Sequence, residues 1–198
     1  MIKPLYKTGL FIGRFQPLHK GHIDIIKKIL KENKQIIIVV GSAEKNYVPE
    51  NPMTAGERVL LIDETLKAEH INPSRYCIIP VRNIDNYALW VDHLNLYVPP
   101  YNAIYTGSPI VKACYEGAQS KHKLIKIKRT RPVSGTAIRL SMLAETPNKT
   151  KDWEKMVPKK TAELLKKLGL PKRIKQIQET MTDTKYKGQS ASGPIPLA

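Results

Sequence analysis

Residues 13–22 read Gly-Arg-Phe-Gln-Pro-Leu-His-Lys-Gly-His and mark the turn on which the fold is built. They follow an apolar run at 9–12, and an amphipathic helical pattern begins as they end. A strand, a glycine-containing turn and a helix start form the first unit of an α/β protein. The first helix, expected from about His19 to Asn33, carries Ile23, Ile26 and Leu30 on one stripe that would pack on the sheet.

Strand-like and helical patterns alternate through the next hundred residues. Further strands are expected near 35–40, 76–81, 102–106 and 122–127, after a first strand near 8–13. A capping box at Thr54 and Glu57 starts a second helix, which should end near Glu69. Its expected apolar series is Val59, Leu60, Ile62 and Leu66. Helices are also expected over 88–97 and 109–116, so the pattern predicts a parallel sheet of about five strands with helices on both faces.

The pattern changes after residue 128. A basic loop at 129–132 leads into Ser134-Gly135-Thr136, which should open a helix running through Leu143. Helical segments at 152–156, 158–168 and 171–180 then follow without strands and predict a small C-terminal helical cap of about 144–180. We expect one domain over 1–180 and a disordered tail at 181–198, which is polar and rich in Ser, Gly and Pro.

The composition limits the protein class. The net charge of +16 would make nucleic acid the first partner to consider, but the lysines are spread over helix faces and no nucleic-acid-binding signature accompanies them. We therefore do not expect a nucleic-acid partner, although charge alone leaves a basic nucleic-acid-binding module open. Cys77 and Cys114 lie among apolar neighbours and are expected to be core thiols in a reducing compartment. Without a run of apolar residues long enough to cross a bilayer, a soluble cytoplasmic protein with no membrane partner is expected.

His19 and His22 stand at the start of the first helix, where the sequence reads His-x-Gly-His. Backbone N–H groups and the positive end of the helix dipole already favour an anion there, and each imidazole can add a directed donor. A lone histidine at such a position would usually be a cap or a solvated side chain. At the carboxyl edge of the first strand, where ligands of α/β sheets bind, the pair favours a phosphate site.

A second candidate anion site lies at Ser134, Gly135 and Thr136 with Arg139. Hydroxyl and N–H groups at a helix start can cradle a phosphate, and Arg139, expected on the first turn, can fold back as a charge-assisted donor. The same residues could form a plain helix cap. Two anion-binding helix starts in one sheet suggest a polyphosphate held at both ends, and such a site suits nucleotidyl transfer, which needs positioning and positive donors.

These motifs resemble the nucleotidyltransferase superfamily, in which His-x-Gly-His follows a first strand and Ser-Gly-Thr-x-Ile-Arg comes late in the chain. The longer strings at 13–22, 41–43, 51–58, 79–81, 90–91 and 134–139 resemble the archaeal type of nicotinamide-nucleotide adenylyltransferase over residues 8 to 175. The resemblance implies a Rossmann-like, doubly wound fold, transfer of AMP from ATP to nicotinamide mononucleotide, and release of NAD and pyrophosphate. It also implies Mg²⁺ or another divalent cation bound mainly through the ATP phosphates, and a homo-oligomer.

The resemblance implies site residues by position. The catalytic set that contacts the ATP phosphates would be Arg14, His19, His22 and Arg139. The rest of the ATP site would be Gly13, Phe15, Gly21, Gly107, Ser134, Gly135 and Thr136. Gly13 would let the backbone pass close to the nucleotide, and Gly21 would keep bulk away from the phosphates. The acceptor site would comprise Ile84, Asp85, Tyr87 and Trp90, with Trp90 stacked on the nicotinamide ring.

The acceptor half departs from the family pattern at three positions. Asn83 stands where aspartate is usual, Tyr87 replaces an asparagine, and Ser108 replaces another asparagine. The acceptor could therefore be nicotinate mononucleotide or another phosphorylated compound, such as FMN or a phosphopantetheine-like molecule. Trp90 could equally be a core residue, and Asp85 a solvated loop charge.

Overall fold

The computed structural model describes residues 6–128, 130–144 and 152–182. Its strands are β1 (Tyr6–Gly13), β2 (Asn33–Val40), β3 (Tyr76–Pro80), β4 (Ala103–Thr106) and β5 (Lys123–Lys126). Its α-helices are α1 (Lys20–Glu32), α2 (Ala55–Ala68), α3 (Trp90–Tyr97), α4 (Pro109–Gly117), α5 (Gly135–Leu143), α6 (Asp152–Met156), α7 (Lys159–Lys167) and α8 (Leu170–Thr182). Two 3₁₀ turns, η1 (Pro73–Arg75) and η2 (Tyr87–Leu89), precede β3 and α3.

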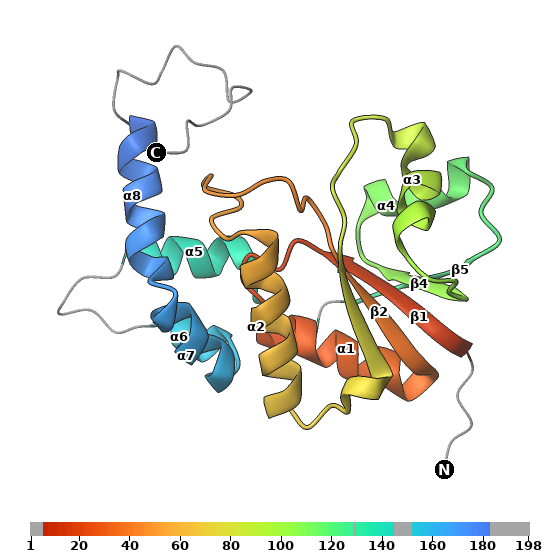
Figure 1. Cartoon of the computed structure of the whole chain (residues 1–198), viewed down its shortest axis with the longest axis horizontal. Helices are drawn as coiled ribbons and strands as arrows, with labels where there is room; N and C mark the ends of the chain where they lie inside the picture. Colours follow the sequence, from red (N-terminus) through yellow and green to blue (C-terminus); the bar gives the residue numbers. More distant parts are fainter. Residues whose placement is uncertain (1–5, 129, 145–151, 183–198) are drawn as a thin grey trace.

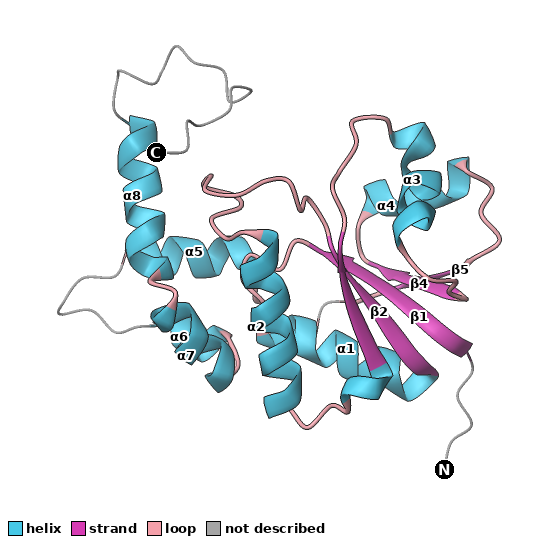
Figure 2. Ribbon diagram, viewed as in Figure 1, coloured by secondary structure: helices cyan, strands magenta, loops and turns pink. Residues whose placement is uncertain are grey.

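The five strands form one parallel sheet in the order β3-β2-β1-β4-β5 (Figure 2). The chain moves outward from β1 to β3, then returns across the sheet to place β4 on the other side of β1. This confirms the expected doubly wound, Rossmann-like architecture. The reversal leaves a crevice at the carboxyl ends of β1 and β4, which is where this architecture binds ligands.

Both faces of the sheet are buried, as the apolar strands predict. Along β2, Ile36, Ile38 and Val40 face a core formed with α1 and α2, while Ile37 and Val39 face a second core formed with α3 and α4. Figure 1 shows α1 and α2 on one side of the sheet and α3 and α4 on the other. The alternation follows from the two-residue period of a strand.

Helix α2 begins as the sequence predicts, but its buried stripe has a different register. Thr54 accepts a hydrogen bond from the Glu57 backbone N–H, and the Glu57 carboxylate accepts one from the Thr54 backbone N–H, which completes the capping box. Leu60, expected in the core, is 51 % exposed. The buried residues of this helix are Arg58, Leu61, Ile62, Thr65 and Leu66. The buried stripe therefore includes Arg58, a charged residue that the apolar pattern does not predict to be buried.

Helices are present in all three C-terminal segments where the sequence predicts them. Helix α7 packs on α2, and α8 packs on α5 and α7, beyond the sheet on the side of α2 (Figure 1). Trp153 of α6 is 1 % exposed and joins the core that α1 and α2 form. Helix α8 continues to Thr182, so the expected tail at 181–198 lies outside the described residues except for its first two positions.

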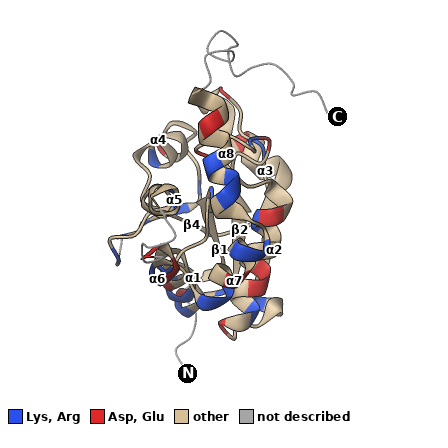
Figure 3. Cartoon of the chain, turned by 90° about the vertical axis from the view of Figure 1, so that its left-hand side faces the viewer, with Lys and Arg blue, Asp and Glu red and all other residues tan. Residues whose placement is uncertain are grey.

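The surface and the cysteines give three further findings. Basic and acidic positions are interspersed over the helices seen in Figure 3. Within the described ranges, every helix is too short or too polar to cross a bilayer, and the cytoplasmic location stays a prediction. Both cysteines are free, but only Cys114 is buried, and Cys77 is exposed, contrary to expectation. Cys77 lies on β3, an edge strand, which has a neighbour on one side only.

A pair of glycine substitutions tests this packing. A Cβ at Gly9 would lie 2.9 Å from Ile29 Cγ2 and 3.0 Å from Tyr105 Cε2, whereas a Cβ at Gly56 would meet nothing within 4 Å. We expect Gly9→Ala to lower the free energy of unfolding by about 1–3 kcal/mol through overpacking. Gly56→Ala should raise it by about 0.4–1 kcal/mol, because alanine restricts the unfolded chain. Urea unfolding measures both changes, and a Gly9→Ala protein as stable as the parent would contradict the packing.

Candidate active site

A cavity of about 540 Å³ opens at the carboxyl ends of β1 and β4. The turn from β1 to α1, the turn from β4 to α4, and the start of α5 form its walls. It brings together residues predicted from both ends of the sequence. The predicted site residues that line it are Arg14, Phe15, His19, Gly21, His22, Gly107, Ser134, Gly135, Thr136 and Arg139.

The two histidines lie against each other at the start of α1. Their rings stack with centroids 3.6 Å apart and planes 20° apart. The backbone N–H of His19, the N-cap residue, donates to Nδ1 of His22 at 3.3 Å. When Nδ1 accepts a hydrogen bond, a neutral ring carries its proton on Nε2. The backbone therefore selects the tautomer in which Nε2 of His22 is the donor.

Arg139 lies on the second turn of α5, not on the first turn as expected, because the helix begins at Gly135. Its side chain folds back toward the helix start, where Nη1 donates to the Gln16 carbonyl at 2.7 Å and Nη2 donates to Thr136 Oγ1 at 3.3 Å. Burial lowers its pKa, and the nearby charge of Arg14 lowers it further, while Glu50 opposes the shift. Ser134 caps the helix by accepting from the Ala137 N–H, and it also lines the cavity.

Arg58 of α2 supports the loops beside the cavity, although the motif at 51–58 does not single it out. Its side chain is fully buried, and its guanidinium donates to the carbonyls of Arg14, Gly41 and Ser42 at 2.8–3.1 Å. Burial lowers its pKa to about 10, although Glu44 opposes the shift, so it stays charged at neutral pH. Arg58 thus joins the segments that follow β1 and β2. Its spacing from Leu61 and Ile62 places it on the buried face of α2, but the spacing does not reveal its backbone partners.

Gln16 is the second residue that sequence reasoning missed. Its side-chain amide bonds the backbone of Met53 twice, with Nε2 donating to the Met53 carbonyl at 2.9 Å and Oε1 accepting from the Met53 N–H at 3.1 Å. The same residue supplies the carbonyl that accepts from Arg139. Gln16 is 3 % exposed, so these bonds form away from bulk water. It therefore connects the loop before α2 with the start of α5.

Gly13 has a different surrounding from the one predicted. It does not line the cavity, and a Cβ on Gly13 would lie 3.0 Å from Cζ of Phe15. Phe15 adopts a left-handed backbone conformation with φ of 50°, and its buried ring packs 4.8 Å from the ring of His22. Gly13 therefore leaves room for the ring that supports His22. Contact of Gly13 with a nucleotide stays a prediction.

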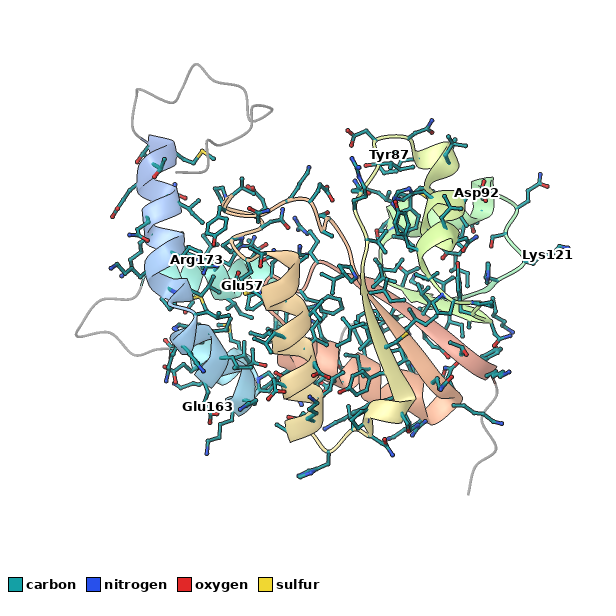
Figure 4. The ribbon with its side chains drawn as sticks, in the orientation of Figure 1. Glu57, Tyr87, Asp92, Lys121, Glu163 and Arg173 are labelled. Atoms are coloured by element: carbon teal, nitrogen blue, oxygen red, sulfur yellow. The ribbon has the colours of Figure 1, made fainter. Side chains whose placement is uncertain are left out.

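The predicted acceptor residues lie outside the cavity lining, in the segment that runs from the end of β3 to Trp90, the first residue of α3. Trp90 is partly buried, and its indole N–H donates to Oδ1 of Asn83 at 3.1 Å. Tyr87 is 56 % exposed and lies at the outer end of this segment (Figure 4). The Asn83 N–H donates to the Glu44 carboxylate at 2.9 Å, which ties this segment to the loop after β2. The acceptor segment therefore borders the same edge of the sheet as the cavity.

The loop before α5 is held against α1. Arg131 Nε donates to Oδ2 of Asp24 at 2.5 Å, and Thr130 donates to the same oxygen at 3.2 Å. These hydrogen bonds, chiefly the one from Arg131, hold the pKa of Asp24 below its ordinary value. Both Thr130 and Arg131 line the cavity. The loop thus adds a guanidinium and a hydroxyl to the lining of the cavity.

The donor set of this cavity suits a phosphate chain. Arginine, histidine, hydroxyl and helix-start N–H groups converge on it, and the lining residues that the structure describes include no Asp or Glu. Over the same described ranges, no cluster of three or more His, Cys, Asp or Glu residues could hold a metal. Mg²⁺ prefers oxygen ligands and commonly reaches proteins on nucleotide phosphates. The residues present therefore fit a cation that is carried by the phosphates of a ligand.

Comparison with known proteins identifies relatives over most of the chain. The cytidylyltransferase-like family model matches residues 10–141. A nicotinamide-nucleotide adenylyltransferase of Pyrobaculum arsenaticum is 41% identical over 167 residues, covering 84% of this chain and 92% of the relative. Another, from Ignicoccus hospitalis, is 40% identical over 86% of this chain and 98% of its own length. A crystal structure of a bifunctional NMN adenylyltransferase/ADP ribose pyrophosphatase from Francisella tularensis superposes with a TM-score of 0.70 at 23% identity. It covers 92% of this chain, which spans 55% of that protein, and it supports the fold alone.

Gly135 offers a test of the anion site. A Cβ at Gly135 would lie 2.7 Å from the Gln16 carbonyl oxygen, at the contact that Arg139 uses. We expect Gly135→Ala to displace the start of α5 and weaken tripolyphosphate binding about tenfold, or about 1.4 kcal/mol. Isothermal titration calorimetry at fixed salt measures this change. Gly56→Ala, another helix-start glycine with open space around it, is the control, and equal affinities in the two variants would contradict the assigned contact.

Proposed function

Because this chain belongs to the cytidylyltransferase-like family, and within it to the nicotinamide-nucleotide adenylyltransferases, we propose that the cavity transfers AMP from ATP to nicotinamide mononucleotide. The products are NAD and pyrophosphate. The observation that carries the proposal is the convergence of Arg14, His19, His22 and Arg139 on one cavity, from segments more than a hundred residues apart. These are the positive and polar donors that a nucleoside triphosphate requires.

The reaction needs one bond to form and one to break. A phosphate oxygen of the mononucleotide attacks the α-phosphorus of ATP, and the bond from that phosphorus to the oxygen bridging to the β-phosphorus breaks. The attacking phosphate is already ionised at neutral pH, so the site needs no general base. Negative charge shifts onto the nonbridging oxygens and the departing pyrophosphate, where preorganised donors lower the barrier.

His22, His19 and Arg139 each have a part in this step. Nε2 of His22 donates to an oxygen that gains charge, and His19 stacks behind that ring and fixes it. Arg139 and the N–H groups at the start of α5 hold the phosphate chain from the opposite wall. Mg²⁺, when it is bound, neutralises phosphate charge, and we assign it to the ATP oxygens because the described lining offers it no carboxylate.

The acceptor assignment rests on Trp90 and its surroundings. An electron-poor pyridinium ring is attracted to the face of an indole, and Asn83 fixes the Trp90 ring through its N–H. Tyr87 is directed away from the core at 56 % exposure, so its replacement of asparagine does not fill the interior of this segment. Self-association into a homo-oligomer stays a prediction.

The proposal is tested by pyrophosphate release from ATP and Mg²⁺ with separate acceptors. Nicotinamide mononucleotide should support turnover well above nicotinate mononucleotide, FMN and phosphopantetheine. Strong release with one of the other acceptors would move the substrate assignment. The absence of turnover with all of them, together with salt-sensitive RNA or DNA binding, would favour the basic nucleic-acid-binding module instead.

His22 should be essential for the rate. We expect His22→Ala to lower kcat about 100-fold or more, the scale of losing one transition-state donor. The fold should remain, because His22 is at the edge of the cavity and not in either core. Steady-state pyrophosphate release measures kcat, and circular dichroism checks the fold. A folded variant with the parent's kcat would remove His22 from the mechanism.

Trp90 should act on the acceptor and not on ATP. We expect Trp90→Ala to raise the KM for nicotinamide mononucleotide about tenfold, or about 1.4 kcal/mol of lost stacking. The KM for ATP should change less than twofold. Initial rates with one substrate varied at a time separate the two constants. If both rise together, Trp90 is a core residue only.

A further inference from the structure

Arg173 of α8 holds a loop that lies between the helical cap and the cavity. Nη1 and Nη2 of Arg173 form two parallel bonds to the Glu57 carboxylate at 2.7 and 2.8 Å. Both side chains are 18% exposed, and Figure 4 shows them directed toward each other between α8 and α2. A two-pronged, largely buried guanidinium–carboxylate pair fixes geometry more tightly than a surface ion pair does.

The same guanidinium also contacts the loop that precedes α2. It lies 5.0 Å from the ring centroid of Tyr47, and Nη1 donates to the Pro52 carbonyl at 3.3 Å. Glu57, held by Arg173, in turn accepts from the Thr54 N–H at 2.9 Å. Residues 47–54 therefore contact Arg173 of the cap directly at Tyr47 and Pro52, and at Thr54 through Glu57.

The far side of this loop is bonded to the cavity wall. Met53 follows Pro52. Its backbone N–H donates to Oε1 of Gln16, and its carbonyl accepts from Nε2 of Gln16. The Gln16 carbonyl receives the 2.7 Å bond from Arg139. Hydrogen bonds and the peptide link between Pro52 and Met53 thus connect Arg173 through the loop and Gln16 to Arg139.

We infer that Arg173 is a positioning residue for adenylyl transfer, because its hold on residues 47–54 sets Gln16 and, through Gln16, the guanidinium of Arg139. This inference rests on the proposed function. Arg173 is not among the residues that line the cavity. Reactions that depend on preorganised donors lose rate steeply when a donor shifts by a fraction of an ångström, so loosening the loop lowers kcat even though the fold persists.

The first experiment compares full-length Arg173→Met with a matched control. Lys166→Met removes another ion pair of the same cap, between Lys166 and Glu154 at 2.8 Å, which is unconnected with the loop. We expect Arg173→Met to lower kcat about tenfold with less than a twofold change in the KM for nicotinamide mononucleotide. Lys166→Met should keep the parent's kcat. Arg173→Lys should be intermediate, because lysine keeps the charge but not the fork.

The second experiment tests whether Arg173 acts through Gln16. Gln16→Met removes the amide that binds Met53, and it is combined with Arg173→Met in a double variant. If the contact chain carries the effect, the loss of kcat in the double variant equals the larger single loss. A residue that only stabilises the cap gives losses that multiply, and this result would overturn the inference. If Arg173→Met does not fold, Arg173→Lys takes its place in the cycle.

Hydrogen exchange provides a readout that does not depend on turnover. The Met53 amide is protected by Gln16 Oε1 and should exchange about tenfold faster in Arg173→Met than in Lys166→Met. Equal exchange in the two variants would overturn the inference. If the parent releases no pyrophosphate with any acceptor, the proposed function fails. The ATP dissociation constants of these variants then test separately whether Arg173 positions Gln16 and Arg139.

Discussion

The site depends on one buried contact, the hydrogen bond from Arg139 to the carbonyl of Gln16. These residues are 123 positions apart, and their bond joins the turn after β1 to the start of α5. Without it, two helix starts that each favour anions would be two separate weak sites. With it, they line one cavity together. The close approach of Gly135 to the same carbonyl shows how little space separates the walls.

The arrangement concentrates positive charge at the cost of intrinsic stability. Burial lowers the pKa values of both Arg58 and Arg139, and the nearby charge of Arg14 lowers them further, so the charged forms of these side chains are disfavoured here. Buried guanidinium groups persist here because backbone carbonyls accept their hydrogen bonds. A polyanion in the cavity relieves the remaining repulsion. Binding of a polyanionic ligand should therefore raise the free energy of unfolding.

Much of this structure was predictable from local sequence patterns. The strands, the helix starts and the alternation of β2 side chains between the two cores follow from apolar periodicity. The residues Thr54 and Ser134 cap the helices that their sequence spacing predicts. His19, His22, Arg14 and Arg139 were predicted to meet, and the structure brings them to one cavity. Arg58 and Gln16 were missed because their partners are backbone carbonyls and N–H groups of distant loops, which no side-chain motif reveals. The same limit explains Gly13, whose neighbour is the ring of Phe15, and Cys77, whose exposure depends on where β3 falls in the sheet.

The contact between α8 and the start of α2 has a consequence for biosynthesis. Glu57 and Arg173 are 116 positions apart, so a ribosome releases the front of the molecule well before the helix that braces it. The sheet can assemble from β1 to β5 in that interval, since domains form progressively as the chain emerges. The loop at 47–54, in contrast, gains its contacts with Arg173 only after the start of α8 has been synthesised. A nascent chain could thus form its parallel sheet before α8 is available to hold residues 47–54.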